Sequence, residues 1–362
     1  MESDEQTEKM TDLIEKKIFD NIKAWSHGIK RGPVLATLRV TNICDLQCRF
    51  CTSKNEKQKK GELTIKDYEK LFKSLYKLNV KVCAIVGGGE ALCKKKLTTG
   101  IVKLINIYKM KGWLVTNGVN FDTKMINDLI KLKFDSILFS IDGANAKTHD
   151  YLRDKKGAFD KAIKSIQLFN KLKQEFRSNK PNLKIQMLVT IKNYHQIEDM
   201  ISLARSLKTT GLLLNFLVEH TPECKKLKLN KKEFSELKIK IKSLLKDKKI
   251  RKFTNFEEFL QIMKLIENRS IYKYNEPYSL GYCYQPWYHL NITETGYINM
   301  CPELYKWQKE NIRQKNVYDI WYGKAFEEFR KKIREKIYIN LCNKFCNLPI
   351  IVENLKISKL LN

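Results

Sequence analysis

Three cysteines fall within eight residues of one another, with the spacing C-x3-C-x2-C, directly after an apolar run. They are Cys44, Cys48 and Cys51. Thiolates of this kind are the usual ligands of iron–sulfur clusters, and a full set is four. A loop that supplies three leaves one iron with an open position, which in metal sites is typical of catalysis rather than of structure. The spacing therefore predicts a reactive iron–sulfur site.

Two other interpretations of the three cysteines remain open. Positions i, i+4 and i+7 also share one face of a helix, so the thiols could be buried in a core. The residues between them, Asp45, Gln47 and Arg49, do not continue an apolar stripe. A zinc site with three thiolate ligands is the second alternative.

This spacing resembles the signature of the radical S-adenosylmethionine (radical SAM) enzymes. The resemblance implies that Cys44, Cys48 and Cys51 bind a [4Fe–4S] cluster whose open iron chelates S-adenosylmethionine. It implies reductive cleavage of that molecule to a 5′-deoxyadenosyl radical, with electrons from a flavodoxin- or ferredoxin-type donor. It also implies that Phe50, just before the last cysteine, lies against the adenine.

The chain around the cysteines alternates between apolar strands and amphipathic helices. Such alternation with nearly continuous apolar strands is typical of an α/β fold with a parallel sheet covered by helices. The resemblance implies a partial (β/α)6 barrel of the TIM type, in which chemistry lies at the carboxyl ends of the strands. The predicted strands span residues 34–40, 82–86, 113–115, 136–143, 184–191 and 212–217.

A glycine turn follows the second predicted strand. Gly88 and Gly89 allow a close backbone approach to a ligand, and Glu90 adds a carboxylate. In radical SAM enzymes a Gly-Gly-Glu-Pro segment here orients the amino group of S-adenosylmethionine. This chain has Ala91 in place of the proline. An ordinary turn is the alternative interpretation.

Other strand ends carry residues that resemble family positions near the same ligand. Thr116 and Asn117 follow the third strand, and Ser140 and Asp142 alternate on the fourth. Arg153 resembles an arginine that pairs with the carboxylate of S-adenosylmethionine, a task for which its planar and always charged fork is suited. A surface charge is the alternative for Arg153.

Four cysteines near the C-terminus form a second set. Cys283, Cys301, Cys342 and Cys346 resemble the SPASM/twitch extension found on many radical SAM enzymes. Four thiolates complete one [4Fe–4S] cluster, which implies the shorter, twitch-like form with one closed auxiliary cluster. A structural zinc site and core thiols are the alternatives. A hairpin around Gly296 is predicted between the first two.

The chain divides into four predicted segments. Residues 1–33 form an N-terminal helix, 34–220 the barrel, 221–274 a basic helical connector, and 275–362 a small twitch/SPASM-like iron–sulfur domain. Within the connector, residues 225–252 carry thirteen Lys or Arg and three Asp or Glu. This pattern predicts first a solvated amphipathic helix and second a surface that faces a polyanion.

Composition narrows the class of protein. No run of about 18 apolar residues is present and no secretory signal is visible, so we expect a cytoplasmic protein without a membrane span. Ten cysteines in such a chain favour metal binding or catalysis over disulfides. The net charge of +29 favours attraction to polyanions, although the lysines are spread along the chain.

Three functions remain from the sequence. The leading hypothesis is a radical SAM oxidoreductase or maturase that oxidises or crosslinks a peptide or protein. The second is dehydrogenation of a small alcohol or sugar, and the third is an RNA-binding or RNA-modifying iron–sulfur protein.

Three further cysteines lie outside the two sets. Cys224, after the last strand, is a candidate catalytic thiol. Cys83 is expected in the core, and for Cys93 a core position is favoured over one in the site.

Overall fold

One sheet of nine strands organises the part of the chain that the structure describes. The computed structural model describes residues 2–54, 56–217, 221–267, 282–304, 307–337, 346 and 348–361. The strand order is β6-β5-β4-β3-β2-β1-β7-β8-β9. Strands β1 to β6 thus follow one another in chain order, and three C-terminal strands continue the sheet beyond β1.

The first six strands are all parallel to their neighbours, as the sequence predicts for an α/β partial barrel. Each lies within two residues of a predicted strand at its start and within three at its end. Their bounds are Leu35–Leu38 (β1), Val82–Ile85 (β2), Lys111–Thr116 (β3), Ser136–Ser140 (β4), Asn182–Val189 (β5) and Gly211–Phe216 (β6).

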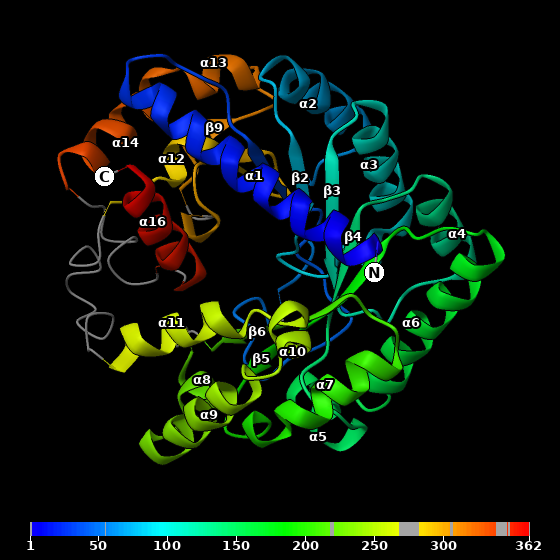
Figure 1. The fold of residues 1–362 in the computed structure, drawn as a ribbon. Coiled ribbons are helices and arrows are strands. Elements are labelled where there is room, and N and C mark those ends of the chain that lie inside the picture. Colours follow the sequence, from blue (N-terminus) through cyan, green and yellow to red (C-terminus); the bar gives the residue numbers. More distant parts are fainter. Residues whose placement is uncertain are drawn as a thin grey trace.

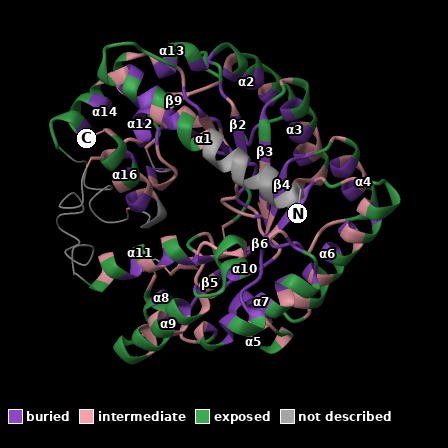
Figure 2. Ribbon diagram, viewed as in Figure 1, coloured by how far each residue is buried: buried purple, intermediate pink, exposed green. Residues whose placement is uncertain are grey.

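Helices lie around the outside of these strands (Figure 1). Their buried faces point toward the sheet and their exposed faces away from it (Figure 2). The first part of the chain contains α1 (Glu2–Ser26), α2 (Ile65–Lys77), η1 (Ala91–Lys94), α3 (Lys95–Ile107), α4 (Thr123–Lys131), α5 (Ala146–Arg153), α6 (Ala158–Glu175), η2 (Tyr194–Gln196) and α7 (Ile197–Ser206).

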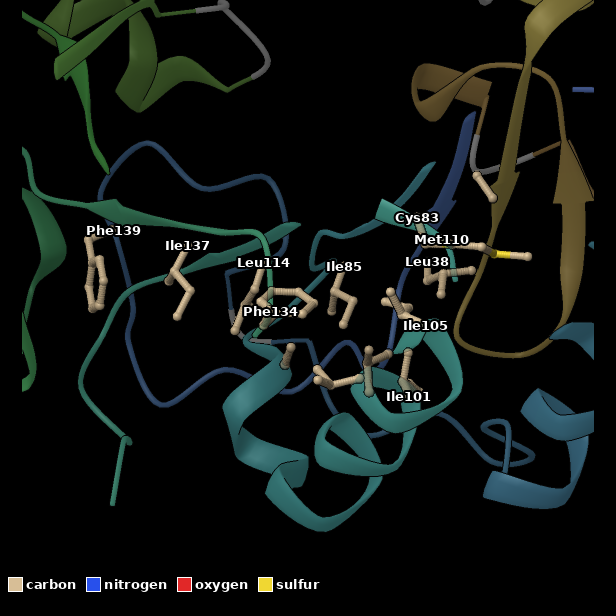
Figure 3. Close-up of a cluster of buried hydrophobic side chains, with 14 of the residues drawn as sticks. Leu38, Cys83, Ile85, Ile101, Ile105, Met110, Leu114, Phe134, Ile137 and Phe139 are labelled. Carbon is tan, nitrogen blue, oxygen red and sulfur yellow. The ribbon is translucent and has the colours of Figure 1, made fainter. Parts of the chain in front are cut away.

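Packing between α3 and the strands illustrates why this arrangement is stable. Ile101 and Ile105 on one face of α3 belong to the same buried cluster as Ile85 of β2 and Leu114 of β3 (Figure 3). Cys83 is fully buried among them, which confirms that it is a core residue. Burial of each such side chain contributes on the order of 1.5–3 kcal/mol.

The basic connector consists of short helices rather than one long one. They are α8 (Pro222–Leu227), α9 (Lys231–Leu244) and α10 (Lys248–Phe253), followed by α11 (Phe256–Glu267). Asn230 and Glu233 form the capping box that the sequence predicts at the start of α9. Leu237 and Ile241 face the core.

The C-terminal part joins the barrel sheet directly. It contains α12 (Gln285–Tyr288), β7 (His289–Ile292), β8 (Tyr297–Asn299), η3 (Pro302–Leu304), β9 (Glu310–Asn311), α13 (Val317–Trp321), α14 (Lys324–Arg334) and α16 (Leu348–Leu361). The predicted hairpin is present as β7 and β8, which are antiparallel. Strand β7 also pairs with β1 in parallel, a contact that the sequence does not predict.

The N-terminal helix packs on this C-terminal part. The Asn21 side chain donates to the Trp287 carbonyl oxygen at 2.7 Å, and Trp25 stacks on Tyr322. Helix α1 therefore contacts segments more than 260 residues away in sequence. Among the described helices, none is long and apolar enough to cross a membrane.

Candidate functional site

The three-cysteine loop begins directly after β1, at the carboxyl end of the parallel strands. Cys48 is buried, and Cys44 and Cys51 are half-buried. Burial is the main cause that raises the pKa of all three thiols, that of Cys44 to about 12. Thiolates at such positions need a positive partner such as a metal cluster, so the donor set fits one.

A buried arginine lies against this loop. Arg153 Nη2 is 2.7 Å from Asp142 Oδ2, and Nη1 is 3.7 Å from Cys48 Sγ. The guanidinium also lies over the Phe50 ring, 5.4 Å from its centroid. Arg153 is thus buried beside the cysteine loop and is not a surface charge, and Phe50 lies beside it.

On the other side of the loop, one carboxylate oxygen contacts two thiols. Asp45 Oδ1 is 4.0 Å from Cys44 Sγ and 3.9 Å from Cys93 Sγ, and it accepts a hydrogen bond from Asn117 Nδ2 at 2.8 Å. Cys93 is half-buried and contacts Asp45, so it lies beside the cysteine loop and not in the core position that the sequence favours for it.

Glu90 connects the ends of β2 and β3. Its carboxylate accepts hydrogen bonds from Leu92 N (3.0 Å), Thr116 Oγ1 (2.8 Å) and Asn117 N (2.8 Å). Burial raises the pKa of Glu90 to about 7, against the opposing effect of these hydrogen bonds. In this structure Glu90 holds the Thr116–Asn117 turn beside the glycine turn.

The two glycines before Glu90 lie where a side chain does not fit. A Cβ on Gly88 would lie 2.0 Å from Arg39 Nη2, and one on Gly89 would lie 2.0 Å from the Ile43 carbonyl oxygen. The turn therefore packs directly on the segment that leads into the cysteines. The absence of a side chain at both positions is therefore required by the packing of the chain itself.

At the end of β4, the side chains of Ser140 and Asp142 each accept a hydrogen bond from β5. Ser140 Oγ accepts from Gln186 Nε2, and Asp142 Oδ1 accepts from the Leu188 amide, both at 2.8 Å. The Asp142 amide in turn donates to His149 Nδ1 at 3.1 Å. These contacts orient Asp142 toward Arg153.

Cys224 lies beside the cysteine loop but has no exposed surface. It contacts the Phe50 carbonyl oxygen at 3.5 Å, and Thr221 Oγ1 is 3.2 Å away. The structure thus brings this thiol close to the loop without opening it to the barrel mouth.

A second thiol cluster lies in the C-terminal part. Cys283, Cys301 and Cys346 line one cavity, together with Gln285, Pro286, Glu303, Leu304, Phe329, Ile333 and Ile350. Burial raises the pKa of Cys301 well above its ordinary value, and the two neighbouring thiols add to the effect. Cys342, the fourth predicted ligand, lies outside the described residues. In the described ranges, no group of three His, Cys, Asp or Glu side chains is arranged to hold a single metal ion.

Some residues of this region do not follow from the sequence. Arg39, Asp45, His149 and Glu294 are neighbours of the site that no motif identifies. Arg39 directly follows the apolar strand β1, a position that could have pointed to it, whereas Glu294 lies in a hairpin turn and carries no such signal; their side chains are 11% and 2% exposed. His149 and Asp45 lie in polar segments and carry no such signal.

The geometry defines an α/β partial barrel with converging thiols at the carboxyl end of its strands. A model of the radical SAM superfamily matches residues 38–204, and a model of SPASM, an iron–sulfur cluster-binding domain, matches residues 283–347. The chain belongs to the radical SAM superfamily and carries a C-terminal SPASM domain.

Curated relatives are similar over about half of the chain. Mycofactocin maturase MftC of Mycobacterium tuberculosis is 27% identical over 183 residues, 51% of this chain and 44% of that protein. The subtilosin biosynthesis protein AlbA of Bacillus subtilis is 26% identical over 187 residues, 51% of this chain and 40% of that protein. The chain thus spans less than half the length of these relatives.

A solved structure shows the same fold over most of the chain. Streptococcus suis SuiB bound to its precursor peptide SuiA has a TM-score of 0.65 and 19% sequence identity. The similarity covers 89% of this chain and 73% of that one. The similarity therefore shows a shared fold over most of the chain.

Proposed function

We propose that the protein is a radical SAM oxidoreductase or maturase that removes a hydrogen atom from a peptide or protein and thereby oxidises or crosslinks it. The observation that carries this proposal is the convergence of one buried and two half-buried thiols, a side-chain-free glycine turn and the Arg153–Asp142 pair at the carboxyl ends of parallel strands.

Each part of the site has a task in this proposal. Cys44, Cys48 and Cys51 hold a [4Fe–4S] cluster with one open iron. S-adenosylmethionine bound there supplies the 5′-deoxyadenosyl radical. Arg153 places a positive charge against Cys48 and favours its thiolate form.

The remaining residues shape the pocket for S-adenosylmethionine. Gly88 and Gly89 allow the backbone to approach it, and Glu90 fixes the turn that carries Thr116 and Asn117. The list of residues proposed to line this pocket is Phe50, Gly88, Gly89, Glu90, Thr116, Asn117, Ser140, Asp142 and Arg153.

The C-terminal thiols are proposed to hold one closed, twitch-like auxiliary cluster. Cys283, Cys301 and Cys346 already share a cavity, and Cys342 supplies the fourth ligand. With no open iron, such a cluster fits an electron acceptor. The substrate loses a hydrogen atom first, and then one electron and one proton. In total, the substrate undergoes a two-electron oxidation.

The peptide substrate is supported by the names of the relatives. MftC and AlbA are a maturase and a bacteriocin biosynthesis protein, and SuiB is solved with a precursor peptide. A low-potential flavodoxin or ferredoxin is the proposed source of the electron for cleavage. No contact of the described residues favours a small alcohol or an RNA over a peptide.

Anaerobic reconstitution with iron counting tests the proposal. We expect about eight irons per chain, the content of two four-iron clusters, and 5′-deoxyadenosine on reduction in the presence of S-adenosylmethionine. Cys283→Ala and Cys301→Ala should lower the iron content to about four and stop product formation, while cleavage continues.

Cys83→Ala is the matched control, because Cys83 is a fully buried thiol outside both clusters and should keep all the iron. No 5′-deoxyadenosine from the wild-type protein, or an unchanged iron content in Cys44→Ala, would contradict the proposal. Zinc in place of iron at the C-terminal thiols would remove the auxiliary electron acceptor.

A further inference from the structure

A buried carboxylate from the C-terminal hairpin reaches the end of β1. Glu294 lies in the turn between β7 and β8, and its side chain is 2% exposed. Its Oε2 is 3.3 Å from Arg39 Nε, and its Oε1 is 2.6 Å from Lys59 Nζ. A buried carboxylate between two cations is stabilised as an anion only while both remain in place.

The first of these cations lies against the glycine turn. The Arg39 guanidinium fills the space where a Cβ of Gly88 would stand, with Nη2 only 2.0 Å from that position. Next to it, the Gly89 amide donates to the Thr41 carbonyl oxygen at 2.9 Å. The shape of the turn therefore depends on where Arg39 is held.

The second cation lies against the segment that leads into the cysteines. The Lys59 amide donates to Asn42 Oδ1 at 3.1 Å, and Asn42 is two residues before Cys44. The Glu294 carbonyl oxygen also accepts from the Leu63 amide at 2.7 Å. Through Arg39 and Lys59, Glu294 is thus connected to the glycine turn and to the segment before the cysteines, which adjoin the pocket that we assign to S-adenosylmethionine.

We propose that Glu294 is a positioning residue for S-adenosylmethionine, which acts through Arg39 on the turn at Gly88 and through Lys59 on the cysteine loop. The proposal rests on the pocket assigned under the proposed function. It means that the SPASM hairpin, besides carrying Cys301, helps to form the binding site of the barrel.

The test is the equilibrium affinity for S-adenosylmethionine, measured by dialysis on the reconstituted protein without substrate. Glu294→Gln should raise the dissociation constant about two- to thirtyfold, the usual range for a residue that acts through others. The iron content should stay that of the wild type, because no cysteine is changed.

Asp135→Asn is the matched control for this variant. Asp135 is also a buried carboxylate with two lysine partners, Lys111 at 3.0 Å and Lys180 at 4.0 Å, but it stands at the amino end of β4, away from the site. Both variants should lose stability, and only Glu294→Gln should lose affinity. An equal loss of affinity in both, or in neither, overturns the proposal.

A double-mutant cycle tests the route through Arg39. If Glu294 acts partly through Arg39, Glu294→Gln should lose less affinity in the Arg39→Gln background than in the wild type, since effects on one network are not additive. Fully additive losses overturn the proposal.

Arg39→Lys keeps the buried charge and serves where the Gln variants do not fold. It should weaken binding because a lysine cannot cover Gly88 as the fork does, and wild-type affinity in this variant overturns the proposal. A wild-type protein that binds no S-adenosylmethionine would instead overturn the proposed function itself.

Discussion

Arg153 and Asp142 form an ion pair of 2.7 Å in which the Asp142 side chain is 1% exposed. The pair joins the end of β4 to the last turn of α5, and Arg153 also contacts Cys48. The Asp142 carboxylate has one further donor, the Leu188 amide. The charge of Asp142 is therefore balanced chiefly by Arg153.

Arg153→Met should destabilise the protein strongly. It leaves the Asp142 carboxylate buried without its cation, which typically costs about 3–5 kcal/mol. Urea unfolding of the iron-loaded protein measures the change. Arg251→Met is the control, because Arg251 and Glu257 form an exposed ion pair, and it should cost less than about 1 kcal/mol. Equal losses in the two variants would show that burial of the pair does not matter.

Gly89→Ala should displace the cysteine loop. Its Cβ would lie 2.0 Å from the Ile43 carbonyl oxygen, a backbone atom next to Cys44. We expect the variant to lose about four irons per chain and to keep the C-terminal cluster. Iron analysis after anaerobic reconstitution measures this.

Gly157→Ala is the control for the glycine turn, since no atom lies within 4 Å of its Cβ position. Its φ of +79° costs about 1–2 kcal/mol with a side chain, so it should lose stability and keep its iron. Full iron content in Gly89→Ala would contradict the steric argument.

The barrel follows from the sequence because its signals are local. Each strand is an apolar run that ends in a polar motif, and the cysteine spacing needs no tertiary information. Parallel strands bring their carboxyl ends to one edge, so Cys44, Glu90 and Asp142 could be placed together in advance.

The contacts that join the segments could not be predicted in the same way. The pairing of β7 with β1 connects Leu35 with His289, and no local pattern records such a distant partner. Glu294 belongs to a hairpin turn, where a charged residue normally faces solvent. Arginine is usually a surface residue, and the burial of Arg153 is explained only by its ion pair with Asp142.

His289 should make the protein sensitive to acid. Its imidazole is buried. Its Nε2 is 2.8 Å from Thr37 Oγ1, and the Gln285 side-chain oxygen accepts a hydrogen bond from its Nδ1. Burial lowers the pKa of His289 from 6.5 to about 3. Below pH 6.5 the unfolded chain binds a proton that the folded chain does not, so this contribution to stability is complete above pH 6.5 and is lost as the pH falls toward 3.

The expected loss from His289 at pH 5 is about 2 kcal/mol relative to pH 7. His289→Gln has no titrating group there, so its free energy of unfolding should fall by about 2 kcal/mol less than that of the wild type between these two pH values. Urea unfolding at both pH values measures the difference. Parallel pH profiles would mean that the imidazole is protonated equally in both states.

Asn255 closes the edge of the sheet at β6. Its Oδ1 accepts from the Leu214 amide at 2.8 Å, and its Nδ2 donates to the Leu214 carbonyl oxygen at 3.0 Å. The Asn255 side chain thereby takes the place of a neighbouring strand. Without this side chain, the Leu214 amide and carbonyl oxygen would be open to pairing with another chain. Asn255→Ala should cost about 1–3 kcal/mol, since part-buried backbone groups lose their partners.

The control for Asn255 is Asn106→Ala, because Asn106 Nδ2 donates to the Leu132 carbonyl oxygen at 2.9 Å on an exposed surface where water can replace it. This variant should change stability by less than about 0.5 kcal/mol. We also expect Asn255→Ala to form dimers or larger species at high concentration, which light scattering detects, since its edge strand is open. A monodisperse variant with wild-type stability would show that the edge at Leu214 is closed by other groups.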